Sequence, residues 1–213
     1  MEILELPLQT EHPPHWVTYI KKKGLPLRRI FLKVTLFLVI FSFSFYLPNQ
    51  VTEIKKREKT IQEIVSVLQS RQTDLSNVVK EDLAEAIYEE AIRYNHDPKF
   101  ILALIDAESN FYNWAVSKAG AKGLMQIMPE VAQDLARQMG IEWMGDRTLF
   151  NPHLNVKMGV YYLSELLKYF DHDLSTAVTA YNYGPTYVRG LLDRKEQLPL
   201  GYYKSVLSTY HTL

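Results

Sequence analysis

Apolar residues recur at intervals of three and four along most of the chain, and the strict alternation typical of β-strands is nearly absent. Around Glu108, apolar residues lie seven, four and three positions earlier, so they share one face of a predicted helix with this carboxylate. These residues are Ile101, Leu104 and Ile105. The helix is predicted to begin at Asp97-Pro98, because Asp is a favoured N-cap and Pro is favoured in the first turn. The pattern predicts a mainly α-helical protein.

The same two signals, apolar stripes and capping residues, predict further helices. They run over residues 83–91, from Pro129 to about Met139, from Asn155 through Phe170, and from an Asp173 cap through Tyr181, with Gly184-Pro185 ending the last. The folded domain is predicted to start near Ser76 and to extend over residues 76–213.

The N-terminal third has a different pattern. Residues 30–47 are almost wholly apolar, and these eighteen residues reach roughly 27 Å as a helix, close to the thickness of a bilayer core. The first alanine of the chain is Ala84, so no small-x-small cleavage site follows the run, which favours a retained transmembrane signal-anchor. Residues 1–29 are then an N-terminal cytoplasmic tail. Residues 48–75 are rich in charge, but the apolar residues among them keep helical spacing, so the segment is predicted to form a helical linker, either a stalk or a segment packed on the domain.

Composition narrows the function classes. Lys plus Arg and Asp plus Glu balance at 24 each, so no overall field favours nucleic acid. The chain has no cysteine, which excludes disulfides and Cys-ligated metals, and its histidines lack metal-ligand spacing. We therefore expect no metal and no cofactor.

Glu108 is the candidate for chemistry. A carboxylate among buried apolar residues must find a basic partner, stay protonated or face a cleft. The Gly-rich segment 117–129 follows closely and is predicted to form a tight polar loop beside it. A carboxylic acid that stays protonated near neutral pH suits general-acid cleavage of a glycosidic bond. An ion-paired structural glutamate is the alternative reading.

A series of short motifs surrounds this residue in order. They are Glu108-Ser109, Ser117, Gly120-Ala121, Gly123 through Pro129, Asn151-Pro152, Asn155, Gly159 and Ala180 through Pro185. From about Leu83 to about Leu207 the chain resembles the catalytic domain of lytic transglycosylases of the soluble-murein type, which are related in fold to goose-type lysozyme. The resemblance implies a lysozyme-like helical domain that acts on peptidoglycan glycan strands.

The resemblance also implies roles for individual residues. Glu108 protonates the leaving oxygen of the MurNAc–GlcNAc β-1,4 bond, then acts as base while the sugar's own C6 hydroxyl closes a 1,6-anhydro ring. The positions expected to bind substrate are Ser117, Gln126, Met128, Tyr181 and Asn182. The hydroxyl of Tyr181 is expected near Glu108, where a hydrogen bond would orient the acid. Structural readings stay open for these residues: a turn, a loop clasp or a core position.

Two positions depart from the family pattern. Val131 stands where the family often has Thr, and residues 198–203 lack the Glu-Thr usually found before the last helix. The second departure leaves the far edge of the cleft undefined.

Two other functions remain open at this point. One is a true hydrolase, a goose-type lysozyme or chitinase-like enzyme, in which Asp146 or another acid positions water. The other is a non-catalytic glycan-binding scaffold. Because peptidoglycan lies outside the bacterial inner membrane, the leading interpretation places the protein there as a single-pass protein with its catalytic domain in the periplasm. The sequence predicts no particular protein partner.

Overall fold

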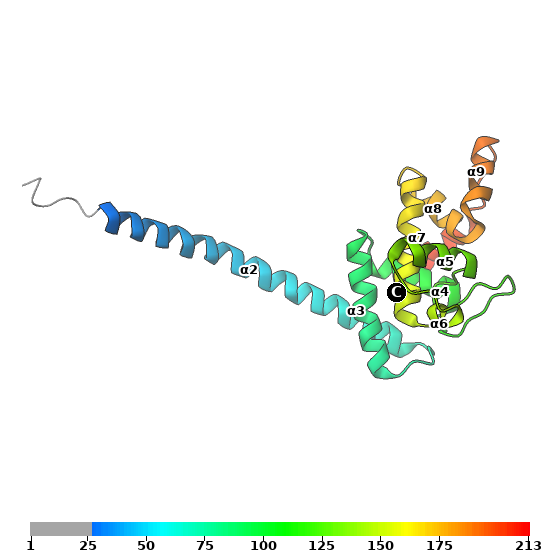
Figure 1. The fold of residues 1–213 in the computed structure, drawn as a ribbon, viewed down its shortest axis with the longest axis horizontal. Helices are drawn as coiled ribbons and strands as arrows, with labels where there is room; N and C mark the ends of the chain where they lie inside the picture. The colour runs from blue at the N-terminus through cyan, green and yellow to red at the C-terminus, as the bar shows by residue number, and fades with distance from the viewer. Residues whose placement is uncertain (1–26) are drawn as a thin grey trace, which may run out of the picture. The chain divides into compact units, whose positions relative to one another are not determined.

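The computed structural model of the chain describes residues 27–213, which form α-helices joined by loops (Figure 1). The helices are α2 (Leu27–Ser70), α3 (Asn77–Arg93), α4 (Pro98–Ser109), α5 (Pro129–Met139), α6 (Asp146–Leu149), α7 (Pro152–Tyr169), α8 (Leu174–Tyr183), α9 (Pro185–Asp193) and α10 (Gly201–Thr212). Within the described residues the β-structure is limited to two isolated bridges, Val116 with Lys122 and Lys122 with Ile127. The predicted mainly α-helical class is confirmed.

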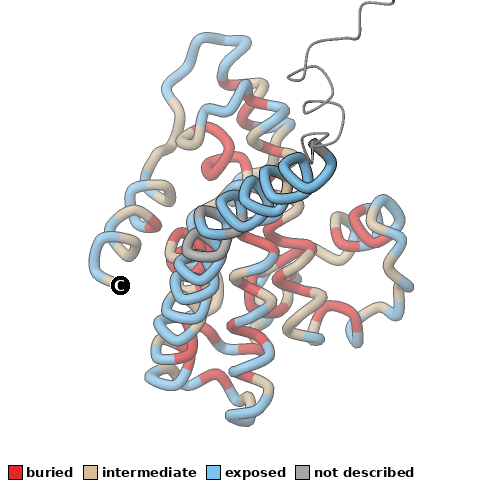
Figure 2. Tube along the Cα trace, turned by 90° about the vertical axis from the view of Figure 1, so that its left-hand side faces the viewer, coloured by how far each residue is buried: buried red, intermediate tan, exposed pale blue. Residues whose placement is uncertain are grey.

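The chain divides into two compact units, residues 1–54 and 55–213, and α2 continues through the boundary. Most described residues of α2 before this boundary are exposed (Figure 2). In the part of the chain that the structure describes, no helix is long and apolar enough to cross a membrane, so the predicted span at residues 30–47 finds no support there. The predicted tail at residues 1–29 lies almost entirely outside the described residues.

Helix α7 is central to the unit of residues 55–213. It contacts α3, α5, α6 and α8, and its stripe of fully buried residues includes Val156, Val160 and Leu163. A helix that buries one apolar stripe against several neighbours forms the centre of a helical domain.

The last part of α2 packs into this same unit. Ile64, Val65 and Leu68 are buried in its main hydrophobic cluster. Of the two arrangements left open for the charged segment, a stalk or packing on the domain, the structure has packing after Lys55. The domain boundary at residue 76 stays a prediction.

Local capping explains where several helices begin. Asp97 accepts a hydrogen bond from the Lys99 amide at 2.9 Å and Pro98 follows it, as predicted. Helix α5 runs over the predicted Pro129–Met139, and Asp173 caps α8. The start of each of these helices depends on only one or two residues, so it can be predicted from the sequence.

Two helix boundaries differ from the prediction. Helix α7 begins at Pro152, not at Asn155, because Asn151 caps it by accepting from the Leu154 amide at 3.1 Å. Gly184 ends α8 as predicted, but Pro185 then begins α9 directly. The pair that stops one helix therefore also starts the next.

Helix α10 determines the surroundings of Glu108. It packs on both α4 and α8. Glu108 lies in the last turn of α4, which ends at Asn110 in the left-handed conformation. The start of α10 therefore lies beside the end of α4.

Candidate active site

Glu108 is a half-buried carboxylate near the end of α4. Its Oε1 atom accepts a hydrogen bond from the hydroxyl of Tyr202 on α10. Burial raises the pKa of Glu108 from 4.5 to about 7, because a carboxylate stripped of water is costly, and the Tyr202 bond acts the other way by stabilising the charged form. The structure does not support the interpretation of Glu108 as an ion-paired structural residue, because its hydrogen-bond partner is the neutral hydroxyl of Tyr202.

Tyr202 is the residue near the acid that the sequence prediction missed. It lies in segment 198–203, which was noted only for departing from the family pattern. Burial and the negative charge of Glu108 raise the pKa of Tyr202 far above its ordinary value, so this phenol keeps its proton and remains a donor. A tyrosine opening the final helix was the available signal, but its partner lies 94 residues away in sequence.

Tyr181 does not make the hydrogen bond predicted for it. Its hydroxyl donates to the backbone carbonyl of Met125 at 2.9 Å, and not to Glu108. Met125 lies in a loop, so its carbonyl has no helical partner and accepts a side chain instead. Burial, then the charge of Glu108, then Tyr162 raise the pKa of Tyr181 well above its ordinary value, so Tyr181 does lie within electrostatic reach of the acid.

The loop between α4 and α5 is fixed by one buried side chain, Asn155 of α7. Its Oδ1 accepts from the Met125 amide at 2.7 Å, and its Nδ2 donates to the carbonyls of Lys122 at 3.0 Å and Leu149 at 2.9 Å. A Cβ on Gly123, where φ is +82°, would lie 2.4 Å from Asn155 Nδ2. Glycine is required there both for the backbone angle and for the space.

Ser117 and Gln126 make hydrogen bonds within this loop. Ser117 Oγ accepts from the Ala121 amide at 3.0 Å. Gln126 Nε2 donates to the carbonyls of Ala115 at 3.1 Å and Gly123 at 2.9 Å. The turn and clasp readings of these two side chains therefore describe real contacts. Their substrate-binding roles stay predictions.

A pocket of about 260 Å³ lies between the start of α5 and the end of α8. It is lined by Gln126, Ile127, Met128, Val131, Tyr162, Tyr181, Asn182, Tyr183, Gly184 and Pro185. Four of the five predicted substrate-binding residues thus meet here, while Ser117 and Glu108 are not among the lining residues. The pocket is at the small end of ligand sites, which suits one part of a longer ligand.

The other carboxylates considered for chemistry have their own partners. Asp146 is exposed and forms an ion pair with Lys122 Nζ at 2.6 Å. Asp106 forms one with Arg71 at 3.4 Å. Glu130 is exposed in the first turn of α5, where the helix dipole favours a negative charge. The geometry around Glu108 thus consists of a single perturbed acid with two tyrosines nearby.

Comparison with known families adds an independent observation. Residues 85–199, more than half of the chain, match the family model described as the transglycosylase SLT domain. This range contains Glu108, the Asn155-held loop and the pocket, but not Tyr202.

Curated relatives match over parts of the chain. Membrane-bound lytic murein transglycosylase C of Actinobacillus pleuropneumoniae is 41% identical over 78 residues, 36% of this chain and 21% of that protein. The protein of the same name from Photorhabdus laumondii is 36% identical over 107 residues, 46% of this chain and 30% of that one. The chain therefore spans about a fifth to a third of the length of these relatives.

Among solved structures, the 70 kDa soluble lytic transglycosylase of Escherichia coli is similar in fold. It has a TM-score of 0.51 and 24% identity, over 63% of this chain and 26% of that one. At this identity the likeness concerns the fold alone. It agrees with the predicted lysozyme-like helical class.

Proposed function

The chain belongs to the transglycosylase SLT domain family, and we propose that it is a lytic transglycosylase that cleaves the glycan strands of peptidoglycan. The observation that carries the proposal is Glu108, whose pKa of about 7 suits a group that must give up a proton and later take one back. The names of the relatives, lytic murein transglycosylases, support the same substrate class.

In the proposed reaction, protonated Glu108 donates its proton to the oxygen of the MurNAc–GlcNAc β-1,4 bond as the bond from C1 to that oxygen breaks. The resulting carboxylate then accepts the proton of the sugar's C6 hydroxyl while that oxygen bonds to C1. The products are a free GlcNAc hydroxyl and a 1,6-anhydro-MurNAc end. No water is consumed, so no second carboxylate is needed.

Tyr202 is proposed to stabilise the state between the two proton transfers. Its hydrogen bond stabilises the ionised form of Glu108, which exists only between the two proton transfers. Burial stabilises the protonated form, which exists before and after. The two influences oppose each other, and a pKa near neutrality is the result.

Substrate contacts are proposed for the pocket beside Tyr181. Met128 and the ring of Tyr181 offer apolar surface, and Asn182 offers a side-chain amide to polar sugar groups. The side-chain nitrogen of Gln126 already donates two hydrogen bonds to the loop, so its side-chain oxygen is the group proposed to contact the sugar. Ser117 is proposed to act by shaping the loop that borders the cleft.

The hydrolase is the alternative, and it needs a carboxylate that positions water. Asp146, the residue considered for this role, is paired with Lys122 and exposed. A non-catalytic scaffold would not need an acid with a perturbed pKa. The raised pKa of Glu108 therefore disfavours the scaffold alternative.

Product analysis of digested murein separates these alternatives. We expect mass spectra with 1,6-anhydro ends, whereas reducing ends would establish a hydrolase and no release of muropeptides would favour a scaffold. Glu108→Gln is expected to lower turnover by at least about 10²–10⁴-fold, since the amide cannot deliver a proton. Glu130→Gln, the same change at an exposed position, serves as control and is expected to retain full activity. Turnover by Glu108→Gln above a tenth of the unaltered protein would exclude the assignment.

We also propose that residues 30–47 hold the protein at a membrane. Two observations support this association: the relatives are named membrane-bound, and α2 has exposed apolar side chains, among them Phe31, Leu36, Phe37 and Ile40. A single-pass arrangement with the catalytic domain in the periplasm would bring Glu108 to the side where peptidoglycan lies.

A further inference from the structure

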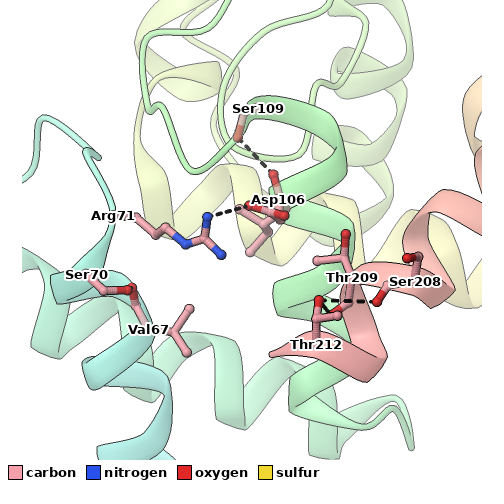
Figure 3. A network of polar contacts seen from close by, with 9 residues as sticks. Val67, Ser70, Arg71, Asp106, Ser109, Ser208, Thr209 and Thr212 are labelled. Carbon is pink, nitrogen blue, oxygen red and sulfur yellow. Dashed lines mark hydrogen bonds and ion pairs between the residues drawn. The ribbon is translucent and has the colours of Figure 1, made fainter.

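The segment that joins α2 to α3 contacts the end of α4 on both sides of Glu108. Arg71 Nη1 lies 3.4 Å from Asp106 Oδ1, two residues before the acid. The same guanidinium lies over the ring of Phe111, three residues after it, at 5.4 Å from the ring centre. The carbonyl of Thr73 accepts the Asn113 amide at 3.3 Å. Figure 3 shows Arg71 reaching from the end of α2 to Asp106.

The turn held by these contacts has an unfavourable backbone. Asn110 has φ of +50° and Phe111 has φ of +63°, and a bulky residue rarely adopts positive φ. Such a conformation persists where surrounding contacts determine it. Phe111 is fully buried, with the Arg71 cation against its ring.

Asp106 has Arg71 as its ion-pair partner. Its Oδ1 atom is buried without a hydrogen-bond partner among the described residues, so the ion pair with Arg71 is the interaction that compensates it. Its side chain is 18% exposed, and that of Arg71 is 35% exposed. Removing one partner of such a pair leaves an uncompensated charge, which is worse than removing both.

The Arg71–Asp106 ion pair lies on the side of α4 opposite to Glu108, so Arg71 is not proposed to contact the substrate. Two residues along an α-helix are about 200° apart, so Asp106 and Glu108 leave α4 on opposite sides. Lys80 Nζ meanwhile donates to the Arg71 carbonyl at 3.4 Å, which fixes the arginine's backbone to α3. Arg71 is thus anchored on one helix and attached to the turn that carries the acid.

We propose that Arg71 is a positioning residue for Glu108: by its ion pair with Asp106 and its contact with Phe111 it holds the last turn of α4 in the geometry that catalysis needs. This inference rests on the proposed function of Glu108 as the acid. It gives the segment before residue 76 a part in the reaction rather than a purely connecting role.

Arg57, on α2, offers a matched control. It too pairs with carboxylates, Glu85 at 2.6 Å and Glu89 at 3.2 Å, and lies over an aromatic ring, Tyr88, at 5.6 Å. Its partners are all on α3 and none is on α4. Arg57→Met therefore removes the same kinds of interaction without touching the turn of Glu108.

The experiment compares full-length Arg71→Met, Arg71→Lys and Arg57→Met in detergent, on soluble glycan strands prepared from murein. We expect Arg71→Met to lower kcat about tenfold, equivalent to about 1.4 kcal/mol, with KM within about twofold. Arg71→Lys keeps the charge beside Asp106 but not the planar group over Phe111, so it is expected to recover part of the loss. Arg57→Met is expected to match the unaltered protein.

Hydrogen exchange supplies a readout that does not depend on activity. In Arg71→Met the amides of Asn110, Tyr112 and Asn113, which close the turn, should exchange at least about tenfold faster, and in Arg57→Met they should not. Equal exchange in the two variants, or faster exchange with unchanged kcat, overturns the proposal. If the unaltered protein cleaves no murein, the proposed function fails, and the exchange data alone decide whether Arg71 holds the turn.

A second variant covers the case in which Arg71→Met does not fold. Asp106→Asn keeps the side-chain volume and removes only the charge that Arg71 pairs with, so it is expected to show the same kcat loss and faster exchange. Normal kcat in a folded Asp106→Asn protein overturns the proposal. In the double variant Arg71→Met with Asp106→Asn, the loss should be smaller than the sum of the two single losses, because neither charge is left alone.

Discussion

At the scale of single residues, the two tyrosine hydroxyls near Glu108 bond to different oxygens. That of Tyr202 reaches the acid, and that of Tyr181 reaches the Met125 carbonyl. A hydrogen bond to a charged group contributes about 1.5–3 kcal/mol, whereas one to a neutral carbonyl contributes about 1 kcal/mol. The two tyrosines therefore should differ in what their loss affects, rate or stability.

Tyr202→Phe is expected to lower turnover roughly ten- to a hundredfold with little change in melting temperature, because the carboxylate loses its donor. It should also shift the alkaline limb of the pH–rate profile upward, since the Tyr202 bond lowers the pKa of Glu108. Tyr181→Phe should instead lower stability by about 1 kcal/mol with a smaller effect on rate. Turnover and melting temperature measured on both variants test this; a greater rate loss in Tyr181→Phe would contradict it.

The raised pKa of Glu108 sets a dependence on pH. The acid must be protonated to act, so kcat/KM should fall about tenfold per pH unit above about pH 7. Stability follows the same group. Between pH 4.5 and about 7 the folded chain holds a proton that the unfolded chain has lost, so the free energy of unfolding falls as pH rises through this window.

Glu108→Gln removes this dependence. The variant should match the unaltered protein below pH 4.5 and exceed it in unfolding free energy by up to about 3 kcal/mol above pH 7. Urea titrations at pH 5 and pH 8 measure the difference. An equal gap at both pH values would show that the carboxylate is not destabilised by burial.

The residue contacts also show which parts of the site can be predicted from local sequence patterns and which cannot. Glu108 was identified because its apolar neighbours lie within seven positions on one helix. Tyr202 was missed because its contact with Glu108 depends on how α10 packs on α4, which no local pattern encodes. The family resemblance places Ser117 and Gln126 at the cleft. Their observed hydrogen bonds lie within the loop, in agreement with the alternative interpretation of these residues as a turn and a loop clasp.

At the scale of elements, α7 fixes a loop that has little regular structure. Asn155 makes three hydrogen bonds to backbone groups. Two go to the loop between α4 and α5, at Lys122 and Met125, and the third goes to Leu149 in α6. Because a buried backbone group without a partner costs about 1–3 kcal/mol, the loop's conformation depends on this side chain. The position of Met125, and through it Tyr181, depends on it in turn.

Asn155→Leu is expected to lower the free energy of unfolding by about 2–4 kcal/mol, since the apolar side chain satisfies none of these groups. Asn151→Ala, which removes the N-cap of the same helix, should cost only about 1 kcal/mol. Denaturant titration of both variants makes the comparison. If the two losses were equal, the three hydrogen bonds of Asn155 would contribute nothing beyond an ordinary cap.

Helix boundaries were predictable where one cap decides them and not where signals overlap. Asp97 and Asp173 lie at observed boundaries because N-cap bonds span only two or three residues. Pro129 lies at a boundary because proline is favoured in the first turn of a helix. The apolar stripe predicts the start of α7 three residues late, because the Asn151-Pro152 cap lies before the first residue of the stripe. The sequence does not distinguish the two roles of Pro185, which follows the end of α8 and is also the first residue of α9.

At the scale of the whole molecule, the chain before residue 76 has two parts with different expected roles. Residues 30–47 are proposed to associate with a membrane, whereas Ile64, Val65 and Leu68 belong to the core. Exposing three buried side chains costs about 1.5–3 kcal/mol each, together comparable to the stability of a typical domain.

Two truncations separate these roles. A chain beginning at Val51 is expected to leave the membrane fraction, to be soluble and to remain active on isolated murein. A chain beginning at Ser76 is expected to lose cooperative unfolding and activity. Fractionation, thermal melts and murein digestion test both. Mature protein whose N-terminal sequence begins after Ser44 would contradict the retained membrane segment.

The bond between Tyr202 and Glu108 also has a consequence in time. Ninety-four positions separate the two residues, and synthesis at roughly 5–20 residues per second needs about 5–20 s to cover them. During that interval the growing chain contains Glu108 but not yet the Tyr202 hydroxyl that donates to it. The complete pair arises only when nearly all of the helical unit, residues 55–213, has been made, so the hydrogen bonding of the proposed acid is completed only late in synthesis.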